Sequence, residues 1–354
     1  MIVLLCKKLL TSIVFALSVL YLMTGCQQNP RQDIMPVLLL VPHYPLPQED
    51  KDFFKRINPY GFVLSIPKHR DMDPNQLRRE LEDVLGRKDF LFFLDQEGGS
   101  VNRLRNFDSS FYSPAASHFG DIAQNDFDFA VAQALKEGGR TGRKLKSYGI
   151  DVVFAPVADV IDREDIFRRS RFYAVNPQVS KALADAFARG LADAGVVPCY
   201  KHFPGFGDKV DSHKTIPVIN ASLAEITSQM KPAFQESKKY GCLMTGHALY
   251  KSLDEQNISS YSAKLYRLAR KTLGFKGIII ADALNMVAAG GPKTNDLGER
   301  MNKAFAAGTD VVMPFFRTYE SPEKKEEILR QIDPKYIKRF QRRARLIKHQ
   351  ALNH

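Results

Sequence analysis

Short apolar runs alternate with longer amphipathic stretches along most of the chain. Four longer stretches, at residues 128–147, 178–194, 223–239 and 262–273, repeat apolar residues at helical spacing. Eight short runs have the length of buried strands: 37–41, 62–66, 90–94, 152–157, 196–200, 242–245, 277–281 and 310–313. Strands that alternate with helices predict an α/β fold with a parallel sheet. Eight such units favour a single-domain (β/α)8 TIM barrel over an open doubly wound sheet.

Size and composition agree with this prediction. The chain has 354 residues, of which 44% are hydrophobic and 25% charged, which suits one large domain. Its formal charge of +12 permits binding to an acidic polymer, an anionic membrane or nucleic acid. The basic residues are spread along the chain and no groove-reading motif is present, so we expect no nucleic-acid partner. The Lys/Arg-rich tail, residues 324–354, predicts a terminal helix with a solvated face.

The N-terminus has the layout of an export signal. Lys7 and Lys8 precede an apolar run, residues 9–23, that ends in Leu22-Met23-Thr24-Gly25-Cys26. A membrane-spanning helix needs about 20 apolar residues, more than this run contains. Small residues directly before a Cys resemble a bacterial lipobox, which implies cleavage before Cys26 and lipidation of its thiol. An uncleaved membrane anchor is the alternative.

These features divide the chain into three predicted parts. Residues 1–25 form a lipoprotein signal peptide, 26–35 a linker after the lipidated Cys26, and 36–354 the folded domain. We therefore expect an exported protein that is lipid-anchored to a cell-envelope membrane, on its periplasmic or extracellular face.

Only two cysteines, Cys199 and Cys242, belong to the predicted domain. Each lies within an apolar strand-like run, where a buried thiol behaves as a small hydrophobic group. No CxxC or Cys/His spacing typical of a metal site occurs. The sequence therefore predicts neither a structural disulfide nor zinc.

Polar residues cluster where five of the predicted strands end. In a barrel, the carboxyl ends of the strands form the active-site face, so these five loops should converge. They are Asp95-Gln96-Glu97-Gly98-Gly99, Ala158-Asp159, Lys201-His202-Phe203-Pro204-Gly205, Gly246-His247 and Asp282-Ala283-Leu284-Asn285-Met286.

Two of the segments contain candidate catalytic groups. Asp282 follows an apolar strand and can serve as a nucleophile at the barrel mouth, or, alternatively, as the N-cap of a following helix. Asp211 and His213 lie in a polar loop rich in Gly and Pro, and a carboxylate two residues away can orient an imidazole as a general acid/base. An ordinary surface turn is the alternative for this pair.

Together these motifs resemble the β-N-acetylglucosaminidase branch of glycoside hydrolase family 3. The Asp95-Gln96-Glu97-Gly98-Gly99 motif, Lys201-His202-Phe203-Pro204-Gly205 with the following Asp211-Ser212-His213, and the Asp282 segment occur in the family's order. The resemblance implies that Asp282 forms a covalent glycosyl-enzyme, and that His213, paired with Asp211, is the acid/base. It implies release of terminal β-linked N-acetylglucosamine from cell-wall fragments or chitooligosaccharides, without a cofactor or metal.

The resemblance also implies a set of substrate-binding residues. They are Asp95, Arg103, Arg171, Lys201 and His202. Arg171 is the best match to an arginine of the family's fourth loop, although Arg168 or Arg169 could take its place. His247 matches a position that lines the site, with a packed structural histidine as the alternative. We expect a small carbohydrate as partner and a monomer.

Two departures from the family pattern lie close to these motifs. Ser100 stands where an arginine is usual, and Phe206 replaces a usual histidine. They leave three alternatives open: another exo-β-glycosidase of the family, a phosphorylase, or a catalytically silent sugar-binding lipoprotein. A β-glucosidase is disfavoured because such relatives take their acid/base from a second domain, whereas this chain has the Asp-Ser-His loop.

Overall fold

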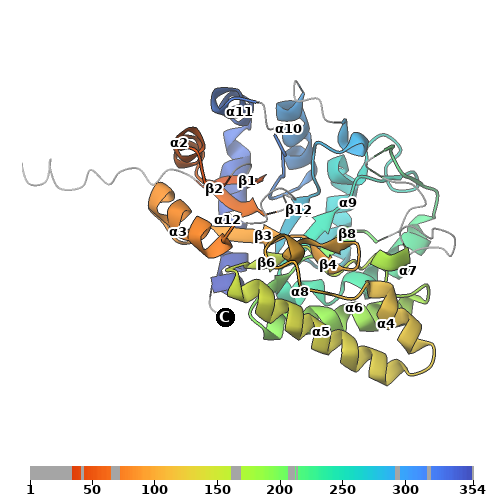
Figure 1. Cartoon of the computed structure of the whole chain (residues 1–354). Helices are drawn as coiled ribbons and strands as arrows, with labels where there is room; N and C mark the ends of the chain where they lie inside the picture. Colours follow the sequence, from red (N-terminus) through yellow and green to blue (C-terminus); the bar gives the residue numbers. More distant parts are fainter. Residues whose placement is uncertain are drawn as a thin grey trace, which may run out of the picture. The chain divides into compact units, whose positions relative to one another are not determined.

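The computed structural model describes residues 34–40, 44–64, 72–160, 169–205, 212, 214–291, 296–316 and 320–352, and strands alternate with helices through them (Figure 1). The principal strands are β1 (Met35–Leu40), β2 (Pro59–Val63), β3 (Leu91–Leu94), β6 (Val152–Val153), β7 (Val197–Pro198), β8 (Tyr200–Phe203), β10 (Cys242–Thr245) and β12 (Ile278–Ala281). All eight predicted apolar runs therefore take part in β-structure, the last through bridges at Val311 and Val312.

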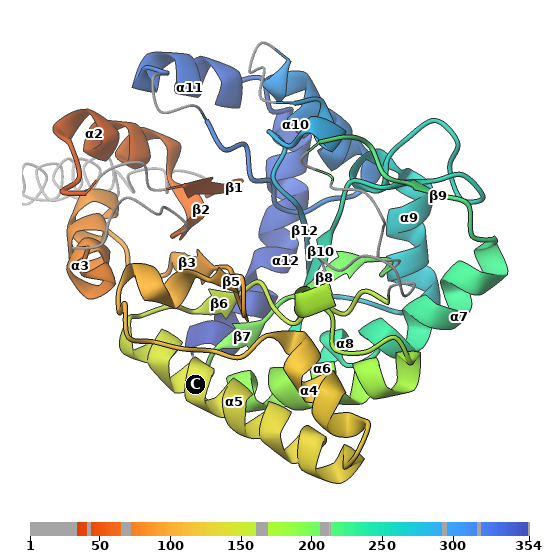
Figure 2. The same ribbon diagram turned by 45° about the vertical axis from the view of Figure 1, so that its right-hand side comes forward.

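The helices lie outside the strands (Figure 2). They are α2 (Gln48–Ile57), α3 (Pro74–Leu85), α4 (Ala116–Ala123), α5 (Phe127–Ser147), α6 (Pro177–Asp193), α7 (Leu223–Phe234), α8 (Ser237–Tyr240), α9 (Ala263–Arg267), α10 (Leu297–Ala307), α11 (Pro322–Leu329) and α12 (Pro334–Leu352). Side chains cap several of them. Asp126 accepts from the Phe129 N–H at the start of α5, and Ser222 forms a capping box with Glu225 at the start of α7.

The principal strands form two parallel sheets. One has the order β1-β2-β3-β6-β7 and the other β12-β10-β8. Parallel bridges connect the sheets: Val37 with Val312, Ile280 with Val311, and Val157 with Lys201. The predicted parallel α/β architecture is thus present, with the strands in two sheets rather than in one uninterrupted ladder.

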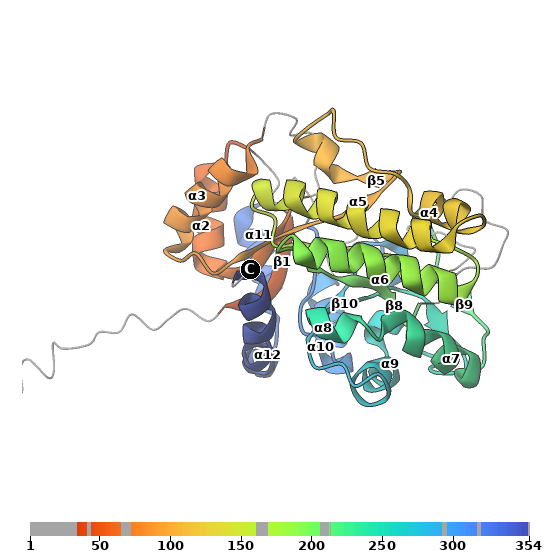
Figure 3. The same cartoon turned by 90° about the horizontal axis from the view of Figure 1, so that it is seen from below.

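Both faces of the strands are buried, as their near-continuous apolar sequences require. Leu91 and Phe93 of β3 pack in one core, whereas Phe92 and Leu94 pack in another between strands and helices. This alternation has the period of two residues that a strand imposes. On the helix side, α5 and α6 lie side by side (Figure 3). Their approach requires Gly138, because a Cβ there would lie 2.1 Å from the Phe187 carbonyl oxygen.

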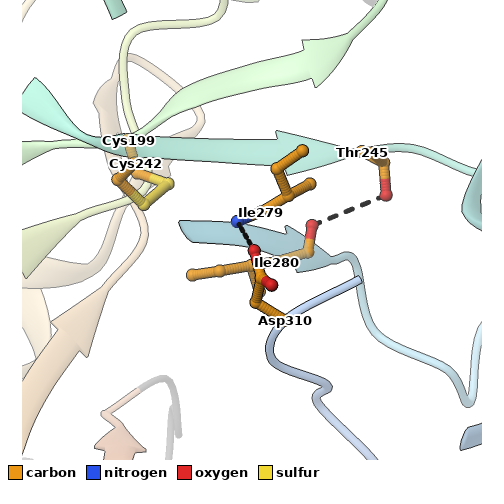
Figure 4. Close-up of a disulfide and its surroundings, with 6 residues drawn as sticks. All are labelled: Cys199, Cys242, Thr245, Ile279, Ile280 and Asp310. Atoms are coloured by element: carbon orange, nitrogen blue, oxygen red, sulfur yellow. Dashed lines mark hydrogen bonds between the residues drawn. A yellow bond between two sulfur atoms is a disulfide. The ribbon is translucent and has the colours of Figure 1, made fainter. Parts of the chain in front are cut away.

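The prediction of free cysteines was wrong, because Cys199 and Cys242 form a disulfide (Figure 4). Tyr200 of β8 pairs with Leu243 of β10, and this register places the residues directly before them, Cys199 and Cys242, with their Cα atoms 4.6 Å apart. Both residues are fully buried, as predicted. Their separation of 43 residues gives no sign of this pairing in the sequence.

The predicted terminal helix is found as two helices, α11 and α12. Phe340 and Ala344 of α12 are buried, and the ring of Phe340 meets the edge of Tyr60 with centroids 4.9 Å apart. Within the described ranges, none of the helices has the length and apolar character needed to cross a bilayer.

Candidate active site at the carboxyl ends of the strands

The strands place most of the predicted site residues at one edge of the sheets. Asp95 directly follows β3, Asp282 directly follows β12, and Lys201 and His202 lie in β8. Because neighbouring strands are parallel, their carboxyl ends meet at the same edge. The convergence that the sequence predicted is therefore present for these residues.

Lys201 is the centre of a buried ion network. Its Nζ lies 2.7 Å from Oδ1 of Asp95 and 2.6 Å from Oε1 of Glu97. Burial by itself would lower the pKa of Lys201, but the two carboxylates raise it above the ordinary value. Lys201 is therefore a fixed cation that holds Asp95 in place, whereas Asp95 remains partly exposed at the edge.

Arg171, in η2 (Arg169–Arg171), binds the same network from another loop. Its guanidinium donates two hydrogen bonds to Glu97, from Nε to Oε2 at 2.7 Å and from Nη2 to Oε1 at 2.8 Å. Burial would raise the pKa of Glu97, but Lys201 and Arg171 outweigh it and hold that pKa far below its ordinary range. Arg171 is thus bound to Glu97, its contact with substrate stays a prediction, and Arg168 lies outside the described residues.

Glu97 is a site residue that sequence reasoning quoted but gave no role. It lies in β4 (Gln96–Gly98), which pairs with β5 (Val101–Asn102) as an antiparallel hairpin. A carboxylate among buried neighbours requires cations, and the chain supplies two of them from distant segments. In the sequence, the signal for a role at this site was the position of Glu97 two residues after Asp95, in the same polar segment.

His202 is oriented by a second residue without a predicted role, Asp159. One oxygen of Asp159 lies 2.7 Å from Nδ1 of His202, and the other accepts the His202 backbone N–H at 2.8 Å. Asp159 is buried. An ionised carboxylate can only accept hydrogen bonds, so Nδ1 carries a proton. Nε2 is then the ring nitrogen left for other contacts.

Asp282 is held as a carboxylate by its surroundings. Its backbone N–H donates to the Thr245 carbonyl at 3.0 Å, and its Oδ1 accepts the N–H of Ala283 at 2.7 Å. Burial would raise the pKa of Asp282, but the neighbouring His202 and the Ala283 N–H lower it by more. An ionised carboxylate is the form that a nucleophile requires. The alternative role as a helix N-cap is wrong, since a turn follows Asp282 and α10 begins only at Leu297.

His247 fastens the backbone next to Asp282. Its Nε2 lies 3.1 Å from the carbonyl oxygen of Ala283, and its Nδ1 lies 2.8 Å from Oγ of Ser260. A carbonyl can only accept, so Nε2 carries the proton and Nδ1 accepts from the Ser260 hydroxyl. Burial lowers the pKa of His247, which keeps the ring neutral. The residue borders the site and also has the structural role that the sequence left open.

Arg103 begins η1 (Arg103–Asn106), directly after the β4–β5 hairpin. Its Nε is buried and has no hydrogen-bond partner among the residues that the structure describes. The neighbouring Leu104 N–H donates to Oε1 of Gln96 at 3.0 Å, which fixes this turn against β4. Ser100, the first departure from the family pattern, is exposed in the hairpin turn.

Four residues singled out in the sequence fall outside the described ranges: Cys26, Phe206, Asp211 and His213, and so does the predicted signal peptide, residues 1–25. Ser212, between Asp211 and His213, is described, and its carbonyl accepts the Ala288 N–H at 3.1 Å. Ala288 belongs to η5 (Val287–Ala289), a few residues after Asp282. The middle residue of the Asp-Ser-His motif is therefore bonded to the segment that follows the candidate nucleophile. No cluster of three or more potential metal-binding side chains occurs in the described part of the chain.

Comparison with known proteins connects this chain to one family. Residues 68–342 match the glycosyl hydrolase family 3 N-terminal domain. A β-hexosaminidase of Psychromonas ingrahamii is 32% identical over 285 residues, which cover 78% of this chain and 82% of that protein.

Solved structures show the same fold. NagZ from Neisseria gonorrhoeae, in complex with N-trifluoroacetyl-D-glucosamine, has a TM-score of 0.69 at 26% identity, over 90% of this chain and 98% of that one. A family 3 β-N-acetylglucosaminidase from Paenibacillus has a TM-score of 0.76 at 23% identity, and the match covers 92% of this chain but only 63% of the Paenibacillus chain. With most of its length matched by the family's domain and by relatives of similar size, this chain belongs to glycosyl hydrolase family 3.

Proposed function

We propose that this protein is a retaining exo-β-N-acetylglucosaminidase that uses Asp282 as its nucleophile. One observation carries the proposal: the Asp282 carboxylate is kept ionised at the same edge as Asp95, Lys201 and His202. The names of the relatives, β-hexosaminidase and β-N-acetylglucosaminidase, supply the substrate class.

The reaction needs two steps at the anomeric carbon. In the first, a carboxylate oxygen of Asp282 bonds to that carbon while the glycosidic C–O bond breaks and His213, as imidazolium, gives a proton to the leaving oxygen. In the second, neutral His213 takes a proton from water, the water oxygen attacks the same carbon, and the bond to Asp282 breaks. Asp211 would orient His213. Two inversions give net retention of configuration.

The ion network supports sugar binding in this proposal. Asp95 is partly exposed and is held by Lys201, so its second oxygen can accept from sugar hydroxyl groups. His202 offers Nε2 to the same space, and Arg103 and Arg171 complete the proposed binding set. Glu97 keeps two cations in place and does not itself need to touch the sugar.

We further propose that the two parallel sheets and their bridges belong to a single (β/α)8 barrel. The bridges at Val37, Val157 and Ile280 support closure, since they connect the sheets at both ends. The described core residues lie within one compact unit, Ile34–His354.

Export and lipidation at Cys26 form part of the same proposal. The predicted signal peptide and lipobox support them, and so does the disulfide, because such bonds persist mainly in oxidising compartments. Under this proposal the natural substrates are fragments of the cell wall or chitooligosaccharides that reach the envelope.

The test is hydrolysis of p-nitrophenyl β-N-acetylglucosaminide compared with the β-glucoside, by wild type, Asp282→Asn and His213→Ala. The proposal expects a preference for the N-acetyl sugar and loss of turnover in both variants. Added phosphate should leave free sugar as the product, whereas a sugar phosphate would identify a phosphorylase. Binding of the sugar without turnover by the folded wild type would identify a silent binding protein.

A further inference from the structure

The amino ends of the parallel strands carry a group of exposed lysines. In such sheets every strand begins at one edge, opposite the edge that holds Asp282. The exposed lysines lie at helix ends or in the loops that lead into β3, β6, β10 and β12. They are Lys88, Lys146, Lys238, Lys239, Lys271 and Lys276. We call this surface the amino edge.

Helix α12 lies along the same amino edge. It contacts β1 and β12, Phe340 packs on Tyr60 near the start of β2, and Nη1 of Arg343 lies 2.6 Å from Oδ1 of Asp310. The helix contains lysines and arginines but no acidic residue. Two of its lysines, Lys335 and Lys338, are exposed, whereas Phe340 and Ala344 are buried.

The helix dipole alone does not account for the exposed lysines of the amino edge and α12. Lysines in the last turn of a helix interact favourably with its dipole, which explains Lys146 and Lys239. That effect is confined to the last turn, whereas Lys335 and Lys338 lie in the first turns of α12 and are exposed. Lys335 also pairs with Asp333, at 2.5 Å between Nζ and Oδ2. A basic helix side of this kind is typical of contact with an anionic lipid surface.

The chain also enters the domain at the amino edge. Ile34 packs against the cluster that contains Phe340. Cys26 precedes Ile34 by eight residues, and an extended chain spans at most about 3.6 Å per residue, or roughly 29 Å. A lipid on Cys26 would therefore hold the start of β1 within that distance of the membrane. This step rests on the proposed lipidation.

We propose that the amino edge, together with α12, docks on an anionic phospholipid membrane. The charges are complementary, and the opposite edge, with the carboxylates Asp95, Asp159 and Asp282, then faces away from the lipid. Substrate can reach the site while the protein is bound. The lipid anchor and the basic surface act as two signals for the same orientation.

The experiment uses the chain from residue 26 with Cys26→Ala, which keeps every described residue but cannot be lipidated. Flotation measures its binding to vesicles of phosphatidylcholine alone and to vesicles with equal parts of phosphatidylglycerol. We expect binding to the anionic vesicles only, weakened by added salt. Each lysine near an anionic surface contributes about five-fold, so Lys238→Gln, Lys271→Gln and Lys276→Gln together should weaken binding roughly a hundred-fold.

A matched variant removes three positive charges from the opposite, carboxyl edge of the strands. Lys251, Lys264 and Lys324 are exposed and lie after β11 (Leu249–Tyr250) or at the starts of α9 and α11. Their change to Gln should leave vesicle binding unchanged. In a second test variant, Lys335→Gln with Lys338→Gln should weaken it. Hydrolysis of a small chromogenic substrate should be equal in all these variants, which shows that each is folded.

Equal binding to neutral and anionic vesicles, or equal loss in the matched variant, would overturn the proposal. Preferential binding to soluble polyphosphate over anionic vesicles would overturn it in favour of an acidic polymer. Incorporation of labelled palmitate by the wild-type chain is measured separately. Its absence would refute lipidation at Cys26, whereas the vesicle result would still decide the docking surface.

Discussion

The ammonium of Lys201 lies 2.6 Å from Oε1 of Glu97, and both side chains are almost completely buried. Buried charges of this kind are stable only when each has its partner. Arg171 supplies the second cation to Glu97, and Asp95 the second carboxylate to Lys201. The network therefore joins three loops and places Asp95 for its proposed contact with the sugar.

Removal of the Glu97 charge should destabilise the protein. We expect Glu97→Gln to lower the free energy of unfolding by about 3 kcal/mol at neutral pH, because Lys201 and Arg171 lose their shared counter-ion. Urea unfolding followed by circular dichroism measures the change. The control is Asp83→Asn, an exposed carboxylate on α3, which should alter stability by about 0.5 kcal/mol at most.

The difference in the free energy of unfolding between wild type and Glu97→Gln should depend on pH. The pKa of Glu97 is lowered on folding, so its contribution is complete above the ordinary carboxyl pKa of about 4.3 and is lost as the pH falls below it. The gap between wild type and Glu97→Gln should therefore shrink as unfolding is measured at increasingly acidic pH. A gap that stays constant down to pH values well below this range would contradict the assignment.

Asp159 should act as a positioning residue for His202. In Asp159→Asn, a neutral amide replaces the carboxylate beside Nδ1, so the hydrogen bond from His202 to a charged acceptor is lost. Hydrogen bonds to charged groups contribute about 1.5 to 3 kcal/mol, so we expect kcat/KM to fall on the order of 10- to 100-fold. Steady-state kinetics with the N-acetylglucosaminide, together with the melting temperature, measures this.

The exposed Asp193 provides the matched change for this experiment, since it is the last residue of α6, which leads into the amino end of β7, and Asp193→Asn removes the same charge away from the carboxyl edge. Unchanged kinetics in Asp159→Asn, with wild-type stability, would show that His202 needs no orienting carboxylate.

His247 should remain neutral with its proton on Nε2. Burial lowers its pKa, so the ring should titrate below the ordinary histidine value of about 6.5, and the associated stability should decrease as the pH falls below that value. Long-range ¹H–¹⁵N correlation spectra of the ring identify the tautomer and the midpoint. A midpoint at or above the ordinary value, or a proton on Nδ1 alone, is incompatible with the bond to Ala283.

The Cys199–Cys242 disulfide should stabilise the domain. Closing a loop of 43 residues contributes about 4 kcal/mol in the chain-entropy account, so reduction by dithiothreitol should lower the melting temperature of wild type. The double variant Cys199→Ala with Cys242→Ala serves as control and should show no effect of the reductant. An intact mass that corresponds to two free thiols in the exported protein would refute the bond.

Much of the fold could be predicted because strand and helix leave different periods in the sequence. The runs at residues 242–245 and 277–281 end where the hydrophobic pattern changes, and the residues that follow them, Gly246-His247 and Asp282, mark the carboxyl edge. The same logic placed Asp95, Lys201 and Asp282 at one edge, and the structure confirms this position.

What the sequence could not supply is contact between distant segments. The disulfide depends on the register between β8 and β10, the Glu97 network on a loop more than 70 residues away, and the His202 tautomer on Asp159. These pairings result from tertiary packing, which local patterns do not encode. The roles of Asp211 and His213 stay predictions, because both residues lie outside the described ranges.

The most direct test of the central claim is chemical rescue of Asp282→Ala. We expect this variant to be inactive on 2,4-dinitrophenyl β-N-acetylglucosaminide and to regain turnover when azide is added, because the small anion enters the space of the missing carboxylate. The product should be the α-configured glycosyl azide, identified by its ¹H NMR coupling constant. Hydrolysis at the wild-type rate without azide, or rescue that yields no α-glycosyl azide, would contradict a nucleophilic role for Asp282.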